Sequence, residues 1–572
     1  MREENSNEII KCHDIITSEE YIDIYHRVSI DSDIEAVAKE VNAECPQHVL
    51  EDYVLFHIKM DQEDCEEFYF NSEFSLLPNL FGLTSTSSIE AAGIGPVLNS
   101  KALNISGNGV LVGIIDTGID YRHEAFIYEN GTSKILSIWD QTIGGNPPEG
   151  FLYGSEYTNE VINKAINSED SLSIVPSIDE IGHGTFMAGL STGRPNRKEA
   201  FQGAAPDAEL IIVKLKQAKK CLKDFLFVKE DAVAYQTSDI YQGIDYVFQK
   251  SKELDRPIVI LLTLASSDGA HDGTFELEEM LAEYGKFNGV ATVLAAGNEA
   301  NSAHHYHGVF KENQDKIDVQ LNVAENEKGV YLNMWCPLPD IVTIELISPS
   351  GNTTGKIPFK SGKWNKTNFP IESSIVNVLY QYTVERTEEE NISILIKDPL
   401  PGLWTIVVYS ALIIRGEFDI YLPINEFIHK NTIFMSPNPN ETIVIPGTNT
   451  GNITVGGYNE VINSLYLPSG RGYTRVGRIK PDIVAPCVNV IGPYPRNTYG
   501  TMSGTSVGAA ITAGASALLL EWGLLRGNEP FLNTIGIKNY LARGARRRKG
   551  IKYPNREWGY GELDLINTFK II

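Results

Sequence analysis

The sequence predicts an α/β protein in which a parallel sheet carries helices on both of its faces. Continuous, mostly apolar runs are typical of strands that are buried on both faces. Four such runs follow one another along the chain, at residues 110–115, 210–215, 258–264 and 290–296. Helical segments lie between them, and in one of these Ile240, Ile244 and Val247 share a face. Strands that alternate with helices in this way favour a parallel sheet.

The length and charge of the chain limit the domain organisation and the kinds of partner that can be expected. With 572 residues, the chain is longer than one ordinary domain, so we expect a large core with one or two smaller units. A hydrophobic fraction of 42% with 21% charged residues is typical of a globular protein. The net charge of −26 argues against nucleic acid and anionic membrane surfaces as partners, because both require basic surface.

Residues 1–80 are predicted to form a separate α+β unit. Residues 21–28 and 53–60 have the composition of strands. Between them, Ser32 and Glu35 form a capping-box pattern, and apolar residues at helical spacing follow. These patterns alone are compatible with an ordinary N-terminal domain.

Residues 305–432 are predicted to form an all-β sandwich inserted into the α/β unit. Helical periodicity fades here, and residues 317–323 alternate between apolar and polar side chains, as in a half-buried strand. Trp335 and Trp404 are interpreted as core residues of this sandwich. The α/β unit is thereby divided into two parts, residues 81–304 and 433–572.

The six cysteines are widely spaced and form no Cys-x-x-Cys pair. This pattern favours a reducing or disulfide-independent setting. The first residues are polar and lack the apolar segment of a secretory signal peptide, and no uninterrupted apolar run reaches membrane length. We therefore expect an intracellular protein with no membrane span.

Four short motifs carry residues suited to acyl transfer. In chain order they are Asp116-Thr117-Gly118, Gly182-His183-Gly184-Thr185, Ala296-Gly297-Asn298 and Gly504-Thr505-Ser506. Each motif alone is more often structural than catalytic. Together they supply what the reaction needs: a nucleophile, a base, a group that orients the base, and donors for an oxyanion. Ser506 precedes an apolar helical run, and a helix N-terminus favours negative charge beside it.

The expected roles follow from this chemistry. Ser506 attacks the carbonyl carbon, and His183 takes the serine proton and later passes it to the leaving amine. Asp116 orients the imidazole and stabilises its charged form. The side-chain amide of Asn298 and the backbone N–H of Ser506 bind the oxyanion.

The four motifs resemble those of the subtilases, serine proteases that share this Asp, His, Ser order. The resemblance extends from Phe81 to the C-terminus, interrupted by the β insert. It includes Gly203-Ala204-Ala205-Pro206, residues 480–486 and Gly559-Tyr560-Gly561. More narrowly, the chain is similar to the Csp proteases of clostridial spores. These combine a propeptide, a subtilase core, and a jelly-roll between the oxyanion Asn and the catalytic Ser.

The resemblance implies a subtilisin-like fold with an inserted jelly-roll at 305–432 and a ferredoxin-like propeptide at 1–80. It also implies a self-processing zymogen whose retained propeptide is cut near residues 77–86. The substrate wall would comprise Leu264, Ala265, Ser266, Ala296 and Gly297. Csp-family members often have Ser-Leu-Gly where this chain has Thr263-Leu264-Ala265, so the added methyl of Ala265 is expected to narrow this side of the cleft.

The function implied by the resemblance is limited proteolysis during spore germination. The expected substrate is the precursor of a cortex-lytic enzyme, and the expected location is the spore. One alternative is a catalytically inactive pseudoprotease that acts in germinant signalling, although the four motifs are intact. Another alternative is a general degradative subtilase, against which the β insert and the retained propeptide argue.

Metal binding is the remaining question that the sequence raises. His304, His305 and His307 cluster after Asn298, but no acidic or cysteine ligand accompanies them at a ligand-like spacing. We interpret them as part of the segment that enters the insert. No metal or other cofactor is predicted; calcium is common in subtilases, but no acidic loop is distinctive enough to assign to it.

Overall fold

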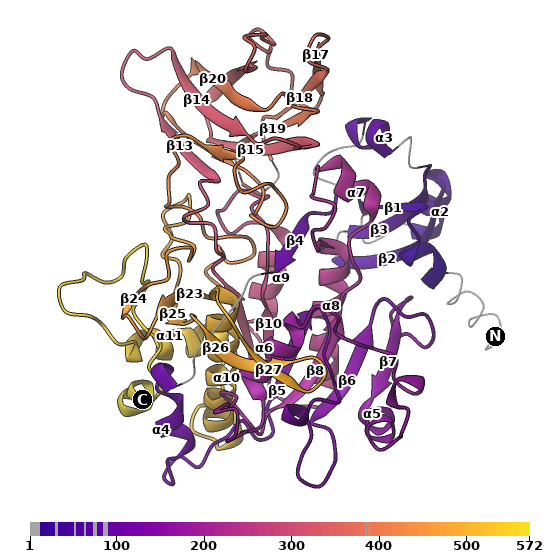
Figure 1. The fold of residues 1–572 in the computed structure, drawn as a ribbon, viewed down its shortest axis with the longest axis vertical. Helices are drawn as coiled ribbons and strands as arrows, with labels where there is room; N and C mark the ends of the chain where they lie inside the picture. Colours follow the sequence, from indigo (N-terminus) through magenta and orange to yellow (C-terminus); the bar gives the residue numbers. More distant parts are fainter. Residues whose placement is uncertain are drawn as a thin grey trace.

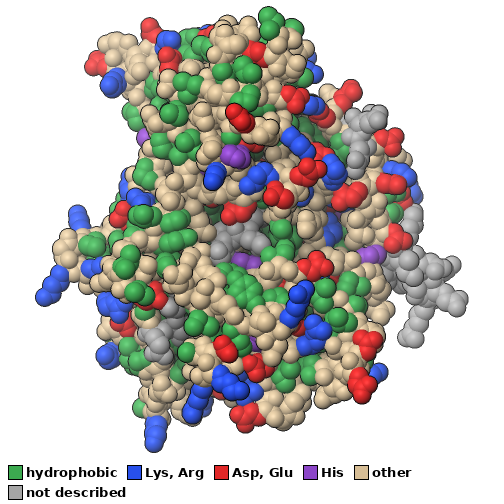
Figure 2. All heavy atoms as spheres, in the orientation of Figure 1, with side chains coloured by type: hydrophobic (Ala, Val, Ile, Leu, Met, Phe, Trp, Pro, Cys, Tyr) green, Lys and Arg blue, Asp and Glu red, His purple; other side chains and the backbone are tan. Residues whose placement is uncertain are grey.

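The computed structural model describes the chain except residues 1–11, 29–32, 51–52, 62–64, 72–76, 84–89, 385 and 388. Three parts can be followed in Figure 1: a small N-terminal part in indigo, a central sheet with helices, and a β-rich part at the top. Acidic and basic side chains are interspersed over the face drawn in Figure 2. The central sheet positions the site and is described first.

The central sheet has the order β24-β23-β12-β10-β5-β8-β6-β7, with β25 also paired to β23. Its inner neighbours are parallel, whereas β7 and β24 add antiparallel edges. The strands are β5 (Leu111–Asp116), β6 (Ile135–Asp140), β7 (Ser155–Thr158), β8 (Glu209–Lys214), β10 (Ile258–Leu262), β12 (Val290–Ala295), β23 (Ile453–Asn459), β24 (Ser464–Leu465) and β25 (Ile483–Pro486). The parallel sheet predicted from the four apolar runs is confirmed.

Helices cover both faces of this sheet, as predicted. Successive residues of β5 point to opposite faces: Val112 belongs to the core beneath α6 (His183–Thr192) and α10 (Thr505–Leu520). Leu111 belongs to the core beneath α8 (Thr237–Glu253) and α9 (Glu276–Tyr284). The remaining helices of this unit are α4 (Ile94–Leu98), α5 (Asn159–Ile166), α7 (Lys220–Phe225), α11 (Thr534–Gly544) and α12 (Leu565–Ile571).

The helix that carries Ser506 is long and strongly apolar. Together with the π-helical turn Glu521–Leu525, it is long and apolar enough to cross a bilayer, and it is the one described helix that meets this test. However, 89% of its apolar window is buried inside the protein. Its apolar character is explained by its place in the core, between α6 and the sheet.

The N-terminal part contains an antiparallel sheet of order β1-β3-β2. Its elements are β1 (Tyr21–Arg27), α2 (Ile34–Glu40), β2 (Ala43–Leu50), β3 (Tyr53–Lys59) and α3 (Cys65–Asn71). Asp33 caps α2 by accepting a hydrogen bond from the Ala36 N–H. Ser32 of the predicted capping box lies outside the described residues.

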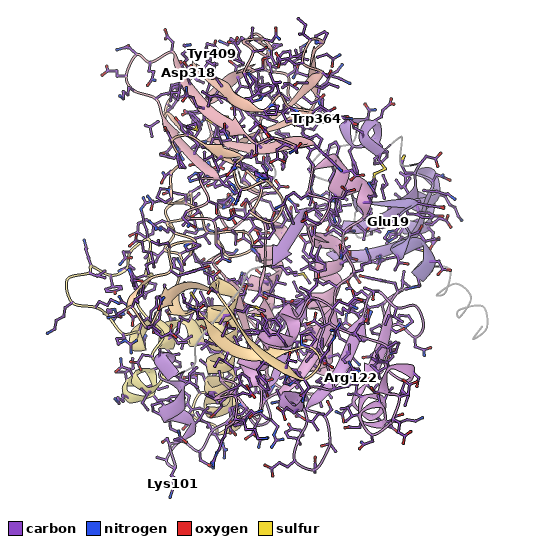
Figure 3. All side chains as sticks on the ribbon, in the orientation of Figure 1. Glu19, Lys101, Arg122, Asp318, Trp364 and Tyr409 are labelled. Atoms are coloured by element: carbon purple, nitrogen blue, oxygen red, sulfur yellow. A yellow bond between two sulfur atoms is a disulfide. The ribbon has the colours of Figure 1, made fainter. Side chains whose placement is uncertain are left out.

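The interpretation of the cysteines as disulfide-independent is wrong. Cys12 is bonded to Cys45, and Cys65 of α3 is bonded to Cys221 of α7. The second bond, drawn in yellow in Figure 3, joins the N-terminal part to the central unit. Spacing gave no hint of it, because its cysteines are 156 residues apart and only the fold brings them together.

The β-rich part consists of two packed sheets. One has the order β13-β21-β15-β19-β18-β17 and the other β16-β20-β14-β22. Their strands are β13 (His305–Val309), β14 (Lys316–Val323), β15 (Gly329–Pro337), β16 (Ile341–Ile347), β17 (Asn365–Phe369), β18 (Ser374–Gln381), β19 (Glu389–Lys397), β20 (Gly402–Leu412), β21 (Glu417–Tyr421) and β22 (Ile433–Phe434). Trp404 lies in the core between the sheets. Trp335 does not: it packs against Ala270 of the central unit and Tyr421.

Candidate active site

Asp116 and His183 form a buried pair at the carboxyl edge of the sheet. Asp116 ends β5 and His183 begins α6, and the imidazole Nδ1 lies 2.8 and 2.9 Å from the two carboxylate oxygens. Their exposed fractions are 0% and 3%, so water screens the pair little. The two motifs pack closely because Gly184 has no side chain. A Cβ at this position would lie 2.2 Å from the carbonyl oxygen of Gly118.

Thr263 connects this pair to Ser506. The Thr263 hydroxyl donates to Oδ2 of Asp116 at 2.9 Å, and the Thr263 carbonyl oxygen accepts from the Ser506 hydroxyl at 3.3 Å. Ser506 is the second residue of α10, where the N-terminal end of the helix dipole favours developing negative charge. Gly504 precedes this helix with φ of +152°, a backbone conformation that favours glycine. The structure therefore brings Asp116, His183 and Ser506 together.

Asn298 is oriented by the residue that precedes the nucleophile. Its Oδ1 accepts from the backbone N–H of Thr505 at 3.1 Å and from the Thr505 hydroxyl at 3.3 Å. Because a backbone N–H can only donate, the side-chain oxygen must face Thr505. The amide NH₂ therefore remains available to an oxyanion. The Thr505 hydroxyl also accepts from the Gly297 N–H at 3.0 Å, which fixes the turn that carries Asn298.

Asp179 is a buried positioning residue that the sequence analysis missed. Its carboxylate accepts from the Thr117 hydroxyl at 2.8 Å, the Gly182 N–H at 2.8 Å and the Thr185 hydroxyl at 2.7 Å. It therefore ties the Asp-Thr-Gly turn to the start of the helix that carries His183. A sequence signal existed: an aspartate shortly before a helix is a common capping residue.

The chain's own segment β4 (Leu80–Leu83) lies in the cleft. It pairs on one side with β11 (Leu264–Ala265) and on the other with β9 (Tyr235–Gln236). The pairing with β11 is antiparallel and places Leu83 opposite Leu264, the residue after Thr263. Two of the predicted substrate-wall residues, Leu264 and Ala265, therefore contact an extended segment of the same chain.

The other predicted wall residues are placed differently. The backbone of Ser266 pairs with Ile445 and not with β4. The backbone N–H and carbonyl oxygen of Ala296 both form hydrogen bonds inside the protein, and so do those of Gly297. These three residues can form the wall of a site, but their paired backbone groups do not offer a further edge to an extended peptide.

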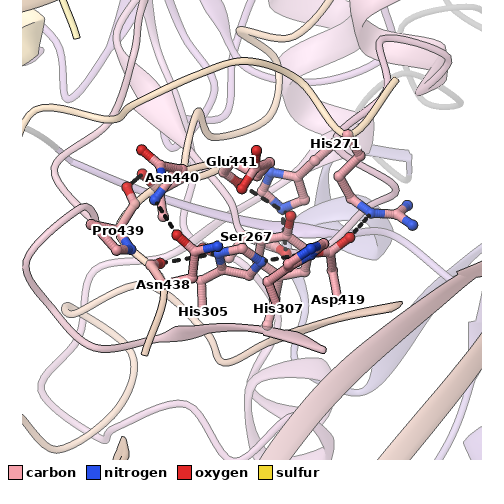
Figure 4. A network of polar contacts seen from close by, with 12 residues as sticks. Ser267, His271, His305, His307, Asp419, Asn438, Pro439, Asn440 and Glu441 are labelled. Atoms are coloured by element: carbon pink, nitrogen blue, oxygen red, sulfur yellow. Dashed lines mark hydrogen bonds and ion pairs between the residues drawn. The ribbon is translucent and has the colours of Figure 1, made fainter. Parts of the chain in front are cut away.

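The histidine cluster is part of an ionic network, shown in Figure 4. His305 and His307 lie on β13, and both contact Oδ1 of Asp419, at 2.9 and 2.8 Å. Arg475 donates to the other oxygen at 2.7 Å. Burial alone would raise the pKa of Asp419, but Arg475 and the two histidines hold it well below its ordinary value. His304 instead contacts Glu299 at 3.0 Å.

This network offers no metal site. Within the described ranges, no group of three or more His, Cys, Asp or Glu side chains is arranged to hold a metal ion. Asp419 comes from β21 and Arg475 from the central unit, so the network joins the β-rich part to the sheet. Its contacts explain the clustered histidines structurally.

Comparison with known proteins places this geometry in a family. A match to the subtilase family spans residues 107–323 and 425–561. This chain belongs to the subtilase family. It is a subtilisin-like serine endopeptidase by this membership, and the interruption of the match at 324–424 falls within the β-rich part.

The subtilase resembles a protease of known structure over most of its length. The CspB protease of Clostridium perfringens is 34% identical, with a TM-score of 0.76, and the similarity covers 85% of this chain and 97% of that one. The C5a peptidase of Streptococcus pyogenes serotype M1 is 23% identical over 444 residues, which cover 72% of this chain. The match spans only 34% of that peptidase. The site-1 protease of Mus musculus is 35% identical over 106 residues, which cover 18% of this chain and 9% of the mouse protein.

Proposed function

We propose that the subtilase cuts peptide bonds with Asp116, His183 and Ser506 as its catalytic triad. The observation that carries this proposal is the buried Asp116–His183 pair, which Thr263 connects to Ser506. The Ser506 oxygen bonds to the carbonyl carbon while His183 accepts the serine proton. The resulting oxyanion is held by the Asn298 amide and the Ser506 N–H. The C–N bond then breaks, His183 protonates the amine, and water hydrolyses the acyl-enzyme.

The N-terminal part acts as a propeptide that the enzyme removes itself. Support comes from β4, which lies antiparallel on β11 in the manner of an extended substrate and runs towards Thr263. Leu83 is opposite Leu264, one residue away from Thr263, so the cut is expected one to three residues after Leu83. This position falls within the range expected from the sequence, 77–86, and its C-terminal end lies outside the described residues.

The physiological substrate is proposed to be the precursor of a spore cortex-lytic enzyme, and the location to be the spore. The likeness to CspB supports both, together with a cleft that holds a segment of the protein's own chain. The β-rich part is proposed to be the jelly-roll insert of that family. The two disulfides favour a compartment in which thiols are oxidised, contrary to the expectation from cysteine spacing.

Two measurements test the catalytic proposal. A fluorophosphonate probe should label the purified protein and fail to label S506A, because only an activated serine reacts. S506A should also remain one uncut chain. The matched control is S173A, which removes an exposed hydroxyl on a short helix and should be labelled and cut like the wild type. An unlabelled wild type would favour the pseudoprotease alternative, and a processed S506A would refute self-cleavage.

A further inference from the structure

A hollow of about 510 Å³ lies on the side of the site that β4 does not occupy. His183, Asn298, Ser503 and Glu426 are among the residues that line it. Its described lining includes no residue of β4, β9 or β11, the strands on the acyl side. Because β4 runs from the acyl side towards Ser506, the residues that follow the cut bond are expected to leave on the opposite side and to enter this hollow.

Glu426 brings a carboxylate into the hollow. It lies on the segment that returns from β21 to the central unit, next to Asn425. Burial and the charge of Glu299 raise the pKa of Glu426 to about 7. A hydrogen bond from its own backbone N–H and the charges of Lys229 and His183 act in the opposite direction. The Glu426 carboxylate and the catalytic histidine line the same hollow.

The groups around Glu426 are already engaged elsewhere. Glu299 accepts from Asn425 at 3.2 Å and contacts His304 at 3.0 Å. The Lys229 ammonium donates to the carbonyl oxygen of Asn425 at 3.1 Å. Among the described contacts, none is a hydrogen bond from another side chain to the Glu426 carboxylate. Within the described part of the chain, no ion pair holds the Glu426 carboxylate, although the Lys229 charge acts on it. A half-buried carboxylate that faces a peptide-sized hollow in this way is suited to bind a cationic group of a ligand.

We propose that Glu426 selects a lysine or arginine at the first or second position after the cut bond. A long basic side chain entering the hollow would supply a charged donor to the Glu426 carboxylate. The proposal rests on the catalytic role of Ser506 proposed above, and it assigns the leaving-group side of that same site a substrate class. Glu426 acts on specificity and takes no part in the chemical steps.

The chain's own junction provides an internal contrast. The sequence after Leu83 has no basic residue until Lys101. Self-cleavage therefore does not use this selection, because a junction already held in the cleft needs no further binding energy. Cleavage of a separate protein substrate lacks that advantage and is where Glu426 should matter.

The test compares three peptides that share the acyl-side sequence of residues 77–84 and carry Lys, Ser or Glu directly after it. The wild type is expected to cleave the Lys peptide with kcat/KM roughly tenfold or more above that of the Ser peptide, with the Glu peptide slowest. In E426Q the Lys and Ser peptides should become equal, while the Ser peptide is cleaved as in the wild type. The matched control E312Q, an exposed carboxylate far along the chain, should keep the preference.

The outcomes separate the two proposals. An equal rate on the Lys and Ser peptides in the wild type, or a preference that survives E426Q, overturns the role of Glu426 while leaving the protease intact. Absence of both cleavage and probe labelling overturns the proposed function. Should the retained N-terminal part keep peptides out, tripeptide amides that begin with Lys or Ser are bound to the processed enzyme. The Lys tripeptide must then bind roughly tenfold more tightly than the Ser tripeptide, and this difference must disappear in E426Q.

Discussion

At the scale of single residues, Thr263 has two roles that its place in the sequence does not reveal. Its hydroxyl contacts Asp116, and its carbonyl oxygen contacts Ser506, so one residue fixes both ends of the site. In the sequence, this position stands out only as a departure from Ser-Leu-Gly. A serine there would keep the hydroxyl, and the threonine adds a methyl that is buried with the rest of the side chain.

We expect T263V to lower kcat by roughly tenfold with KM nearly unchanged. Valine has the shape of threonine but leaves Oδ2 of the buried Asp116 with one donor fewer, at a cost of about 1–3 kcal/mol. That cost falls on the alignment of His183 and not on peptide binding. Steady-state kinetics on a peptide substrate measures both parameters. T263S should recover the wild-type rate; if T263S is as slow as T263V, the hydroxyl is not the reason.

At the scale of elements, the N-terminal sheet meets the central unit through buried polar groups. Asp23 of β1 contacts Nδ1 of His57 at 2.6 Å and the Lys219 ammonium at 3.0 Å. The Gln47 amide nitrogen lies 2.9 Å from Nε2 of His57, so the imidazole accepts there and is neutral. Nearby, Glu19, labelled in Figure 3, accepts from the Lys220 N–H at 2.6 Å.

These contacts predict that acid weakens retention of the N-terminal part. Burial lowers the pKa of His57 from 6.5, so below about pH 6.5 the released part binds a proton that the docked part does not. Burial alone would raise the pKa of Asp23, but Lys219 and His57 lower it from 3.8. The contribution of ionised Asp23 to docking of the N-terminal part is therefore complete above about pH 4 and is lost as the pH falls further. The pKa shifts of His57 and Asp23 therefore both favour release of the N-terminal part in acid.

The measurement uses processed C221S, in which only non-covalent contacts hold the N-terminal part. Size-exclusion chromatography should recover less of this part with the central unit at pH 5 than at pH 8. H57Q should flatten the change between these two values, whereas H26Q, which alters the neighbouring strand residue that faces away from Asp23, should not. Equal recovery at both pH values in C221S would contradict the expectation.

Sequence periodicity predicted the central strands because burial on both faces leaves a continuous apolar run, as in β10 and β12. It did not place Trp335, because an aromatic residue at the boundary of two units has the same local pattern as one in a core. The positioning roles of Asp179 and Thr505 were missed for a related reason: the contacts of Asp179 with Thr117 and of Thr505 with Asn298 form only in the folded chain.

At the scale of the whole molecule, the three parts are joined by contacts of different chemistry. The β-rich part is tied to the central unit by the network of Asp419, Arg475 and Glu389. It also touches α3 through Trp364, whose ring centroid lies 5.0 Å from that of Phe70. The N-terminal part has a covalent link in addition, the Cys65–Cys221 disulfide. That link spans the expected cut after Leu83, since one cysteine precedes the cut and the other follows it.

Processing should therefore not separate the two fragments. With free thiols blocked, the processed protein is expected to migrate in a denaturing gel as one species near 63.3 kDa without reductant and as two fragments with it. C221S should give two fragments in both conditions. C45S is the matched control, because the Cys12–Cys45 bond lies wholly before the cut and its loss should not free either fragment. Two fragments from the unreduced wild type would show that the link is absent.

The link also predicts how activity on a separate substrate depends on reductant. A tethered segment sits near its binding site at an effective concentration in the millimolar range, so dilution does not remove it. While the tether holds, β4 keeps the acyl side of the cleft filled between β11 and β9. Reduction allows the cut segment to diffuse away, and cleavage of an added peptide should then rise upon dilution. Processed C221S should show the same rise without reductant; if dilution changes neither protein, the segment does not block the cleft.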